Sequence, residues 1–122
     1  MFTHVKFVEL PVLNQDRAIA FYRDKAELVV RQDAPYSDGW RWIEMEIPDA
    51  RTRVVFVKAV PGDIRDTPRL VLVSDDIDSI YRKLGSRGVE FTVPPRAAEW
   101  DPKERYALFR DSEGNIVMVG EG

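Results

Sequence analysis

The stretch "SDDIDSIYRKLGSRGVEF", residues 74–91, contains a helix with a signal at each end. Asp75 or Asp76 can cap its first turn with a carboxylate, and Gly85 and Gly88 are residues that commonly end a helix. Apolar side chains recur between them at helical spacing, namely Ile77, Ile80, Tyr81 and Leu84. Strand patterns flank this helix, with "RLVLVS" before it and "VEFTV", "RYALFRD" and "NIVMVG" after it. The second half of the chain is therefore predicted to have the order βαβββ.

The first half repeats this order. A strand is predicted over residues 4–12, and Asn14 then caps a helix over "QDRAIAFYRDKA". Three strands follow, "ELVVRQ", "WRWIEMEI" and "RTRVVFVKAV", separated by the predicted turns "DAPYSDG" and "PDA". Ile19 and Ile80 occupy equivalent helix positions, which indicates an internal repeat of one supersecondary unit.

This repeat predicts an α+β fold of two βαβββ modules whose curled mixed sheet surrounds a cavity. The segment "VPGDIRDTP" contains two prolines, a glycine and three charged residues, and so reads as a linker. We expect one domain over residues 1–122, with module 1 at about 1–60, a linker at 61–67 and module 2 at about 68–122.

Strand alternation assigns side chains to the two faces of each sheet. In the first strand Val8, Leu10 and Val12 suit the helix side, which turns Phe7 and Glu9 to the other face. The same alternation turns further residues away from the helices: Trp40, Trp42, Glu44, Glu46, Arg69, Val71 and Val73. In the strand over residues 51–60 either Val55 and Val57 or Phe56 and Lys58 could face the cavity. Charges and indoles that share a concave face predict a pocket.

Composition excludes several classes of protein. Hydrophobic residues make up 44% of the 122 positions and charged residues 32%, the balance of a globular protein. The net charge of -3 and the interspersed signs leave no basic face, so nucleic acid is not an expected partner. The absence of cysteine excludes disulfides and a thiol nucleophile, and it fits a reducing cytoplasm. No signal-peptide pattern and no run of about 18 apolar residues is present, so we expect a cytoplasmic protein without a membrane partner.

Three motifs in order, "DRAIAFYRD", "SDDIDSIYRKLGSRGVEF" and "FRDSEGN", make the chain similar to the vicinal oxygen chelate superfamily. This superfamily includes glyoxalase I, extradiol dioxygenases, fosfomycin-modifying enzymes and bleomycin-binding resistance proteins. The resemblance covers essentially the whole chain and is specific for the fold, although one fold hosts many activities. It implies a homodimer that completes its sites across a two-fold axis.

The resemblance also implies where a divalent metal would be held, by one His, Gln or Glu side chain from each of four strands. The matching positions here are Phe7, Arg69, Met118 and a position near Phe56. A phenyl ring is no ligand, a thioether is a poor ligand for a hard cation, and a guanidinium repels the metal. The chain departs from the family pattern at all four positions. We therefore expect no metal and no cofactor, as in the bleomycin-binding branch.

Other candidate residues have two interpretations each. Trp40 and Trp42 could stack on a planar ligand or fill a core or dimer interface, and Trp100 could cover the pocket mouth, contact a partner subunit or pack within its loop. Glu9, Glu44, Lys58 and Arg69 could form a polar recognition set or internal salt bridges. The single histidine, His4, is expected at the surface.

Three functional hypotheses follow. The leading one is a metal-independent binding protein for a small organic molecule, planar or cationic, with antibiotic resistance by sequestration as one version. Its predicted ligand-binding residues are Phe7, Trp40, Trp42, Phe56, Arg69, Trp100 and Met118. The alternative is an enzyme of the glyoxalase, isomerase or dioxygenase type, with a shifted metal site or a metal-free mechanism that uses Glu9, Glu44 or Lys58. The third is an interaction module whose cavity is filled by side chains.

Overall fold

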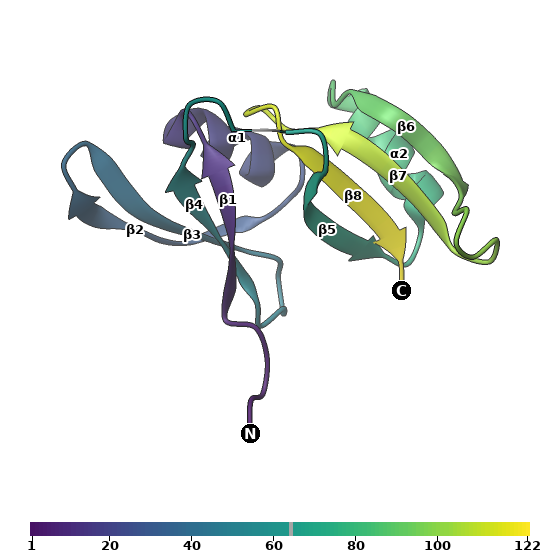
Figure 1. Cartoon of the computed structure of the whole chain (residues 1–122), viewed down its shortest axis with the longest axis horizontal. Coiled ribbons are helices and arrows are strands. Elements are labelled where there is room, and N and C mark those ends of the chain that lie inside the picture. The colour runs from purple at the N-terminus through teal and green to yellow at the C-terminus, as the bar shows by residue number, and fades with distance from the viewer. Residues whose placement is uncertain (64) are drawn as a thin grey trace. The chain divides into compact units, whose positions relative to one another are not determined.

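A computed structural model describes residues 1–63 and 65–122 of the chain. The chain divides into two compact units, Met1–Asp63 and Ile64–Gly122, which we call unit 1 and unit 2 (Figure 1). Position 64 belongs to the predicted linker 61–67 and lies outside the described residues. Neither helix of the described chain has the length and apolar character that a membrane crossing requires.

Unit 1 is one mixed sheet with a helix on one face. Its elements are β1 (Phe7–Val12), α1 (Gln15–Asp24), β2 (Val29–Ser37), β3 (Trp40–Glu46) and β4 (Arg53–Lys58). The strand order across the sheet is β1-β4-β3-β2, with β1 parallel to β4 and the other neighbours antiparallel. Helix α1 contacts β2 and β3 and covers the face that carries the core.

Unit 2 repeats this architecture strand by strand (Figure 1). Its elements are β5 (Pro68–Ser74), α2 (Ile77–Ser86), β6 (Phe91–Ala97), β7 (Arg105–Arg110) and β8 (Ile116–Glu121). The strand order is β5-β8-β7-β6, again with one parallel pair, and α2 contacts β6, β7 and β8. The predicted α+β fold of two βαβββ modules is confirmed, and neither sheet closes into a barrel.

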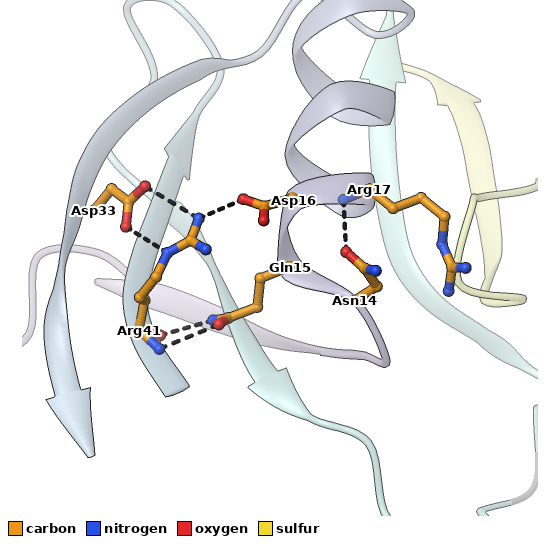
Figure 2. Close-up of polar contacts among 6 residues, drawn as sticks. All are labelled: Asn14, Gln15, Asp16, Arg17, Asp33 and Arg41. Carbon is orange, nitrogen blue, oxygen red and sulfur yellow. Dashed lines mark hydrogen bonds and ion pairs between the residues drawn. The ribbon is translucent and has the colours of Figure 1, made fainter. Parts of the chain in front are cut away.

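Both helices begin at the predicted cap residues. Asn14 Oδ1 accepts a hydrogen bond from the Arg17 main-chain N–H at 3.0 Å, as Figure 2 shows. Of the two candidates for α2, Asp76 is the cap, because its Oδ1 accepts from the Ser79 N–H at 3.0 Å. Each bond satisfies a main-chain donor that has no partner within the helix.

Each unit has its own core between helix and sheet. The buried apolar residues of unit 1 include Leu10, Val12, Ala18, Ile19, Phe21, Tyr22, Ile43, Met45, Val54 and Phe56. Those of unit 2 include Leu70, Ile77, Leu84, Ala107, Phe109, Val117 and Val119. The predicted alternation holds in β5, where Leu70 is buried while Val71 and Val73 are 58% and 67% exposed.

A polar clamp joins α1 to the β2–β3 hairpin (Figure 2). The side-chain amide of Gln15 donates to the Arg41 carbonyl at 2.7 Å and accepts from the Arg41 N–H at 3.1 Å, as a neighbouring strand would. The Arg41 guanidinium bridges Asp33 on β2 and Asp16 on α1, at 2.9 and 2.8 Å. Because Trp40 and Trp42 flank Arg41, the clamp fixes the main chain between these two indoles.

Two strands run further than the sequence predicts. The prediction of a turn over "DAPYSDG" was wrong for most of these residues, because β2 continues through Pro35 to Ser37. Strand β6 likewise continues through Pro94 and Pro95 to Ala97. Both are edge strands, where a proline that lacks an N–H removes no ladder hydrogen bond on the solvent side. Register shifts lie beside the prolines in both pairings.

Candidate functional site

The candidate site is a pocket of about 290 Å³ within unit 1. All four strands or their connecting turn contribute to its lining, which comprises Glu9, Tyr36, Ser37, Asp38, Trp40, Trp42, Phe56, Val57 and Lys58. This volume lies near the lower end of the range of small-molecule sites, which is about 300–1,000 Å³.

Aromatic rings form one wall of the pocket. The Trp42 ring centroid lies 5.3 Å from that of Tyr36, with the planes tilted by 52°. The ring of Phe7 meets Trp42 edge to face at 5.8 Å and 86°. Both are favourable geometries for aromatic pairs, so Trp42 is held between one ring from β1 and one from β2. Phe7, although absent from the pocket lining, supports the indole that lines it.

The charged side chains of the lining are Glu9, Asp38 and Lys58, two carboxylates and one ammonium. In the part of the chain that the structure describes, no hydrogen bond or ion pair engages any of these three groups. Two carboxylates against one ammonium give the lining a net negative charge. Carboxylates beside aromatic rings favour a cationic or hydrogen-bond-donating ligand.

Glu44 lies on the same face, and each oxygen of its carboxylate accepts a hydrogen bond from a protein donor. Its Oε2 accepts from the Trp42 Nε1–H at 2.7 Å and its Oε1 accepts from Arg53 Nη1 at 2.7 Å. The hydrogen bond from Trp42, followed by that from Arg53, lowers the pKa of Glu44 from its ordinary value. For Glu44 the structure therefore shows the internal salt bridge that was one of its two interpretations, whereas Glu9 and Lys58 line the pocket.

The face assignment that the sequence left open in β4 is decided by register and ring contacts. Val55 pairs with Glu9 on β1 and with Glu44 on β3, and so shares their face. The Phe56 ring packs against Tyr22 of α1 at 5.9 Å, and Phe56 is 1% exposed. Phe56 borders the pocket with its ring turned to the helix side. The Phe56 ring therefore belongs to the core, and a ligand-binding role for Phe56 stays a prediction.

The remaining predicted residues belong to unit 2. Met118 pairs with Val71 and Leu108, on the sheet face opposite the core, and Arg69 is half-buried in β5. Trp100 is 63% exposed, and its ring lies over Tyr106 at 5.4 Å with 33° between the planes. Its Nε1–H donates to Glu104 Oε2 at 2.9 Å. None of the three predicted residues lines the unit 1 pocket, and their role in ligand binding stays a prediction.

The donor set does not fit a divalent metal. The positions that the resemblance assigns to metal ligands, namely Phe7, Arg69, Met118 and one near Phe56, carry no carboxylate or imidazole. Within residues 1–63 and 65–122, no three His, Asp or Glu side chains gather into a group that could hold a metal ion. His4 is exposed, as predicted, and its Nδ1 lies 2.9 Å from the hydroxyl of Thr3.

Sequence reasoning missed four lining residues, Tyr36, Ser37, Asp38 and Val57. Three of them lie in or directly after the part of β2 that the sequence predicts as a turn. Tyr36 was the feature that could have indicated a longer strand, because aromatic residues are typical of strands and Tyr36 directly precedes the short turn sequence "SDG". Ala34 pairs with Trp42, which brings the Tyr36 ring close to the indole.

Comparison with known proteins identifies the family. Residues 3–119 match the Glyoxalase/Bleomycin resistance protein/Dioxygenase superfamily. The chain belongs to this superfamily.

Two solved structures and one protein known from its sequence are similar to this chain over nearly its whole length. It is 28% identical to TnmS3, an antibiotic binding protein from Streptomyces sp. CB03234, with a TM-score of 0.83 over 98% of this chain and 96% of that one. A superfamily member from Sphaerobacter thermophilus DSM 20745 is 26% identical, with a TM-score of 0.86 over 99% and 98% of the two chains. The uncharacterized protein YetH of Bacillus subtilis (strain 168) is 28% identical over 99% of this chain and all of its own length.

Proposed function

We propose that this superfamily member is a metal-independent binding protein for a small organic molecule, of the antibiotic-resistance type. The ligand class is a planar aromatic molecule that carries a cationic or hydrogen-bond-donating group. The observation that carries the proposal is the unit 1 pocket, in which aromatic rings stand beside the carboxylates of Glu9 and Asp38. The pocket serves recognition and leaves the molecule unchanged, so resistance would come from sequestration.

Two further observations support a binding role. The aromatic wall is held in place by ring contacts to Trp42, which lowers the entropy lost when a planar ligand stacks on it. The similarity to TnmS3 extends over nearly the whole of both chains, and TnmS3 is an antibiotic binding protein.

The proposal includes a cytoplasmic protein that assembles as a homodimer. Val71 and Val73 of β5 give unit 2 an apolar surface that contact with a second copy would remove from water. Size-exclusion chromatography with light scattering measures the assembly directly, and a monomer at all concentrations would remove the homodimer from the proposal.

A thermal-shift screen tests the binding role. The panel contains planar aromatic compounds in pairs, one with an amine and one with a carboxylate on the same ring system, together with glycopeptide antibiotics. At a ligand concentration about 100 times Kd, binding stabilises the folded state by about 2.7 kcal/mol, which raises Tm by several degrees. We expect a shift for an amine member and a smaller one for its carboxylate partner.

Metal independence is tested in the same screen. The shift is expected to be equal in EDTA and after incubation with zinc, nickel, manganese or ferrous iron, with bound metal well below one ion per chain by mass spectrometry. Stoichiometric metal, or a shift that EDTA abolishes, would overturn the metal-independent part. No shift with any compound would count against binding as the function.

One observation favours the alternative of a metal-free enzyme, since Glu9 and Lys58 line the same pocket and neither is engaged elsewhere in the described chain. Such a pair could transfer a proton to and from a bound substrate. Replacement of Glu9 by glutamine separates the two functions. For a binding protein we expect weaker binding of cations and no turnover in either form, whereas an enzyme that uses Glu9 would lose turnover while it still binds substrate.

A further inference from the structure

The carboxylate of Glu44 accepts two hydrogen bonds, one from a residue of the pocket and one from a residue of the neighbouring strand. Oε2 receives the indole N–H of Trp42, which lines the pocket, and Oε1 receives Arg53 on the neighbouring strand β4. Both bonds are 2.7 Å long, and the Glu44 side chain is only 13% exposed. Charge-assisted bonds of this length are stronger than neutral ones and fix the direction of both partners.

The Glu44 carboxylate belongs to a series of side chains of alternating charge on neighbouring strands. Arg53 also lies 3.8 Å from Glu46, and Glu46 accepts a hydrogen bond from Arg31 on β2. Three strands thus contribute to the placement of Glu44. Because these contacts restrain the Glu44 side chain, Glu44 can in turn restrain the Trp42 indole that donates to it.

We propose that Glu44 is the positioning residue that sets the orientation of the Trp42 indole in the unit 1 pocket. The inference deepens the proposed function and rests on it, because an indole of fixed orientation matters where a planar ligand stacks. Phe7 and Tyr36 restrain the Trp42 ring by contact, whereas the bond to Glu44 acts on its N–H edge. That bond favours one orientation of the ring about its χ2 angle.

This assignment differs from proton transfer by Glu44. Both oxygens already accept hydrogen bonds from protein donors, and the same bonds lower the pKa of the carboxyl group. A carboxylate stabilised in its ionised form is a weaker base, and each of its oxygens already has a protein donor. Glu44 therefore acts through Trp42.

The test compares two uncharged variants, Glu44→Gln and Glu44→Leu. Both lose the ion pair with Arg53, but the glutamine keeps an oxygen that can accept the Trp42 N–H, and the leucine does not. The measurement is the indole N–H signal of Trp42 in a proton–nitrogen NMR spectrum of the free protein, assigned with Trp42→Phe. We expect the signal in Glu44→Gln to stay close to that of the native protein. In Glu44→Leu it should move and exchange with water roughly fivefold faster, or more.

A second tryptophan provides a matched control. Trp100 donates its indole N–H to Glu104 at 2.9 Å in the same arrangement, on an exposed loop of unit 2. Glu104→Leu should change the Trp100 signal and leave the Trp42 signal in place.

The proposal fails if Glu44→Leu leaves the Trp42 signal and its exchange rate unchanged. It also fails if Glu44→Gln changes them as much as Glu44→Leu, because the ion pair alone would then explain the role of Glu44. If Glu44→Leu does not fold, the Glu44→Gln spectrum still decides, since loss of the native Trp42 signal there overturns the proposal. All readouts use the free protein, so a negative ligand screen would not change their outcome.

Discussion

Replacement of Trp42 by alanine is expected to weaken binding of any amine compound that shifts Tm by roughly 30-fold, which corresponds to about 2 kcal/mol. Trp42 is the residue on which the aromatic wall depends, because it contacts both Tyr36 and Phe7 while it lines the pocket. Its removal deletes the stacking surface and also releases its two neighbours. Isothermal titration calorimetry of both proteins with the same compound measures the change in Kd.

The control for this prediction removes an aromatic side chain elsewhere. Tyr81 on α2 contacts Phe91 in unit 2 and is partly exposed, so Tyr81→Ala should lower stability without a comparable change in Kd. If Trp42→Ala bound the compound as tightly as the native protein, the unit 1 pocket would not be the binding site.

Replacement of Phe56 by alanine is expected to reduce the free energy of unfolding by about 3–5 kcal/mol, the range for removal of a buried phenyl ring. The ring lies in the core of unit 1 against Tyr22, so its loss leaves a cavity between the sheet and α1. A loss of this size is a large fraction of the total stability of a small protein. Urea unfolding followed by circular dichroism measures it.

The neighbouring residue provides the comparison. Val57 is half-buried and lines the pocket, so Val57→Ala should cost about 1 kcal/mol. If Phe56→Ala cost no more than Val57→Ala but abolished ligand binding, the Phe56 ring would belong to the pocket and the assignment of faces in β4 would be wrong.

Much of the fold was predictable because it depends on local patterns. Ile19 and Ile80 mark helices whose apolar spacing repeats within a few residues, and Asn14 and Asp76 cap them through main-chain groups three residues away. The alternation in β1 and β3 placed Leu10 and Met45 on the core side for the same reason, since neighbouring side chains on a strand point to opposite faces.

The ends of β2 and β6 were not predictable in this way. Proline usually interrupts a strand, and Pro35, Pro94 and Pro95 were read accordingly. Whether a proline is tolerated depends on whether its strand has one neighbour or two, and that is a property of the whole sheet. The misread segment of β2 carries Tyr36, so the error in the fold also became an error in the pocket.

By itself, the sequence determined the two βαβββ modules and the Asn14 cap of the first helix, because each follows from the identity and spacing of nearby residues. Only the tertiary structure decided that Asp76 caps α2, which face of β4 carries Phe56, and that Glu44 joins Trp42 to Arg53. In β4 both faces are apolar, so local hydrophobicity could not distinguish them. Hydrogen bonds between strands depend on register, which is fixed only when the whole sheet forms.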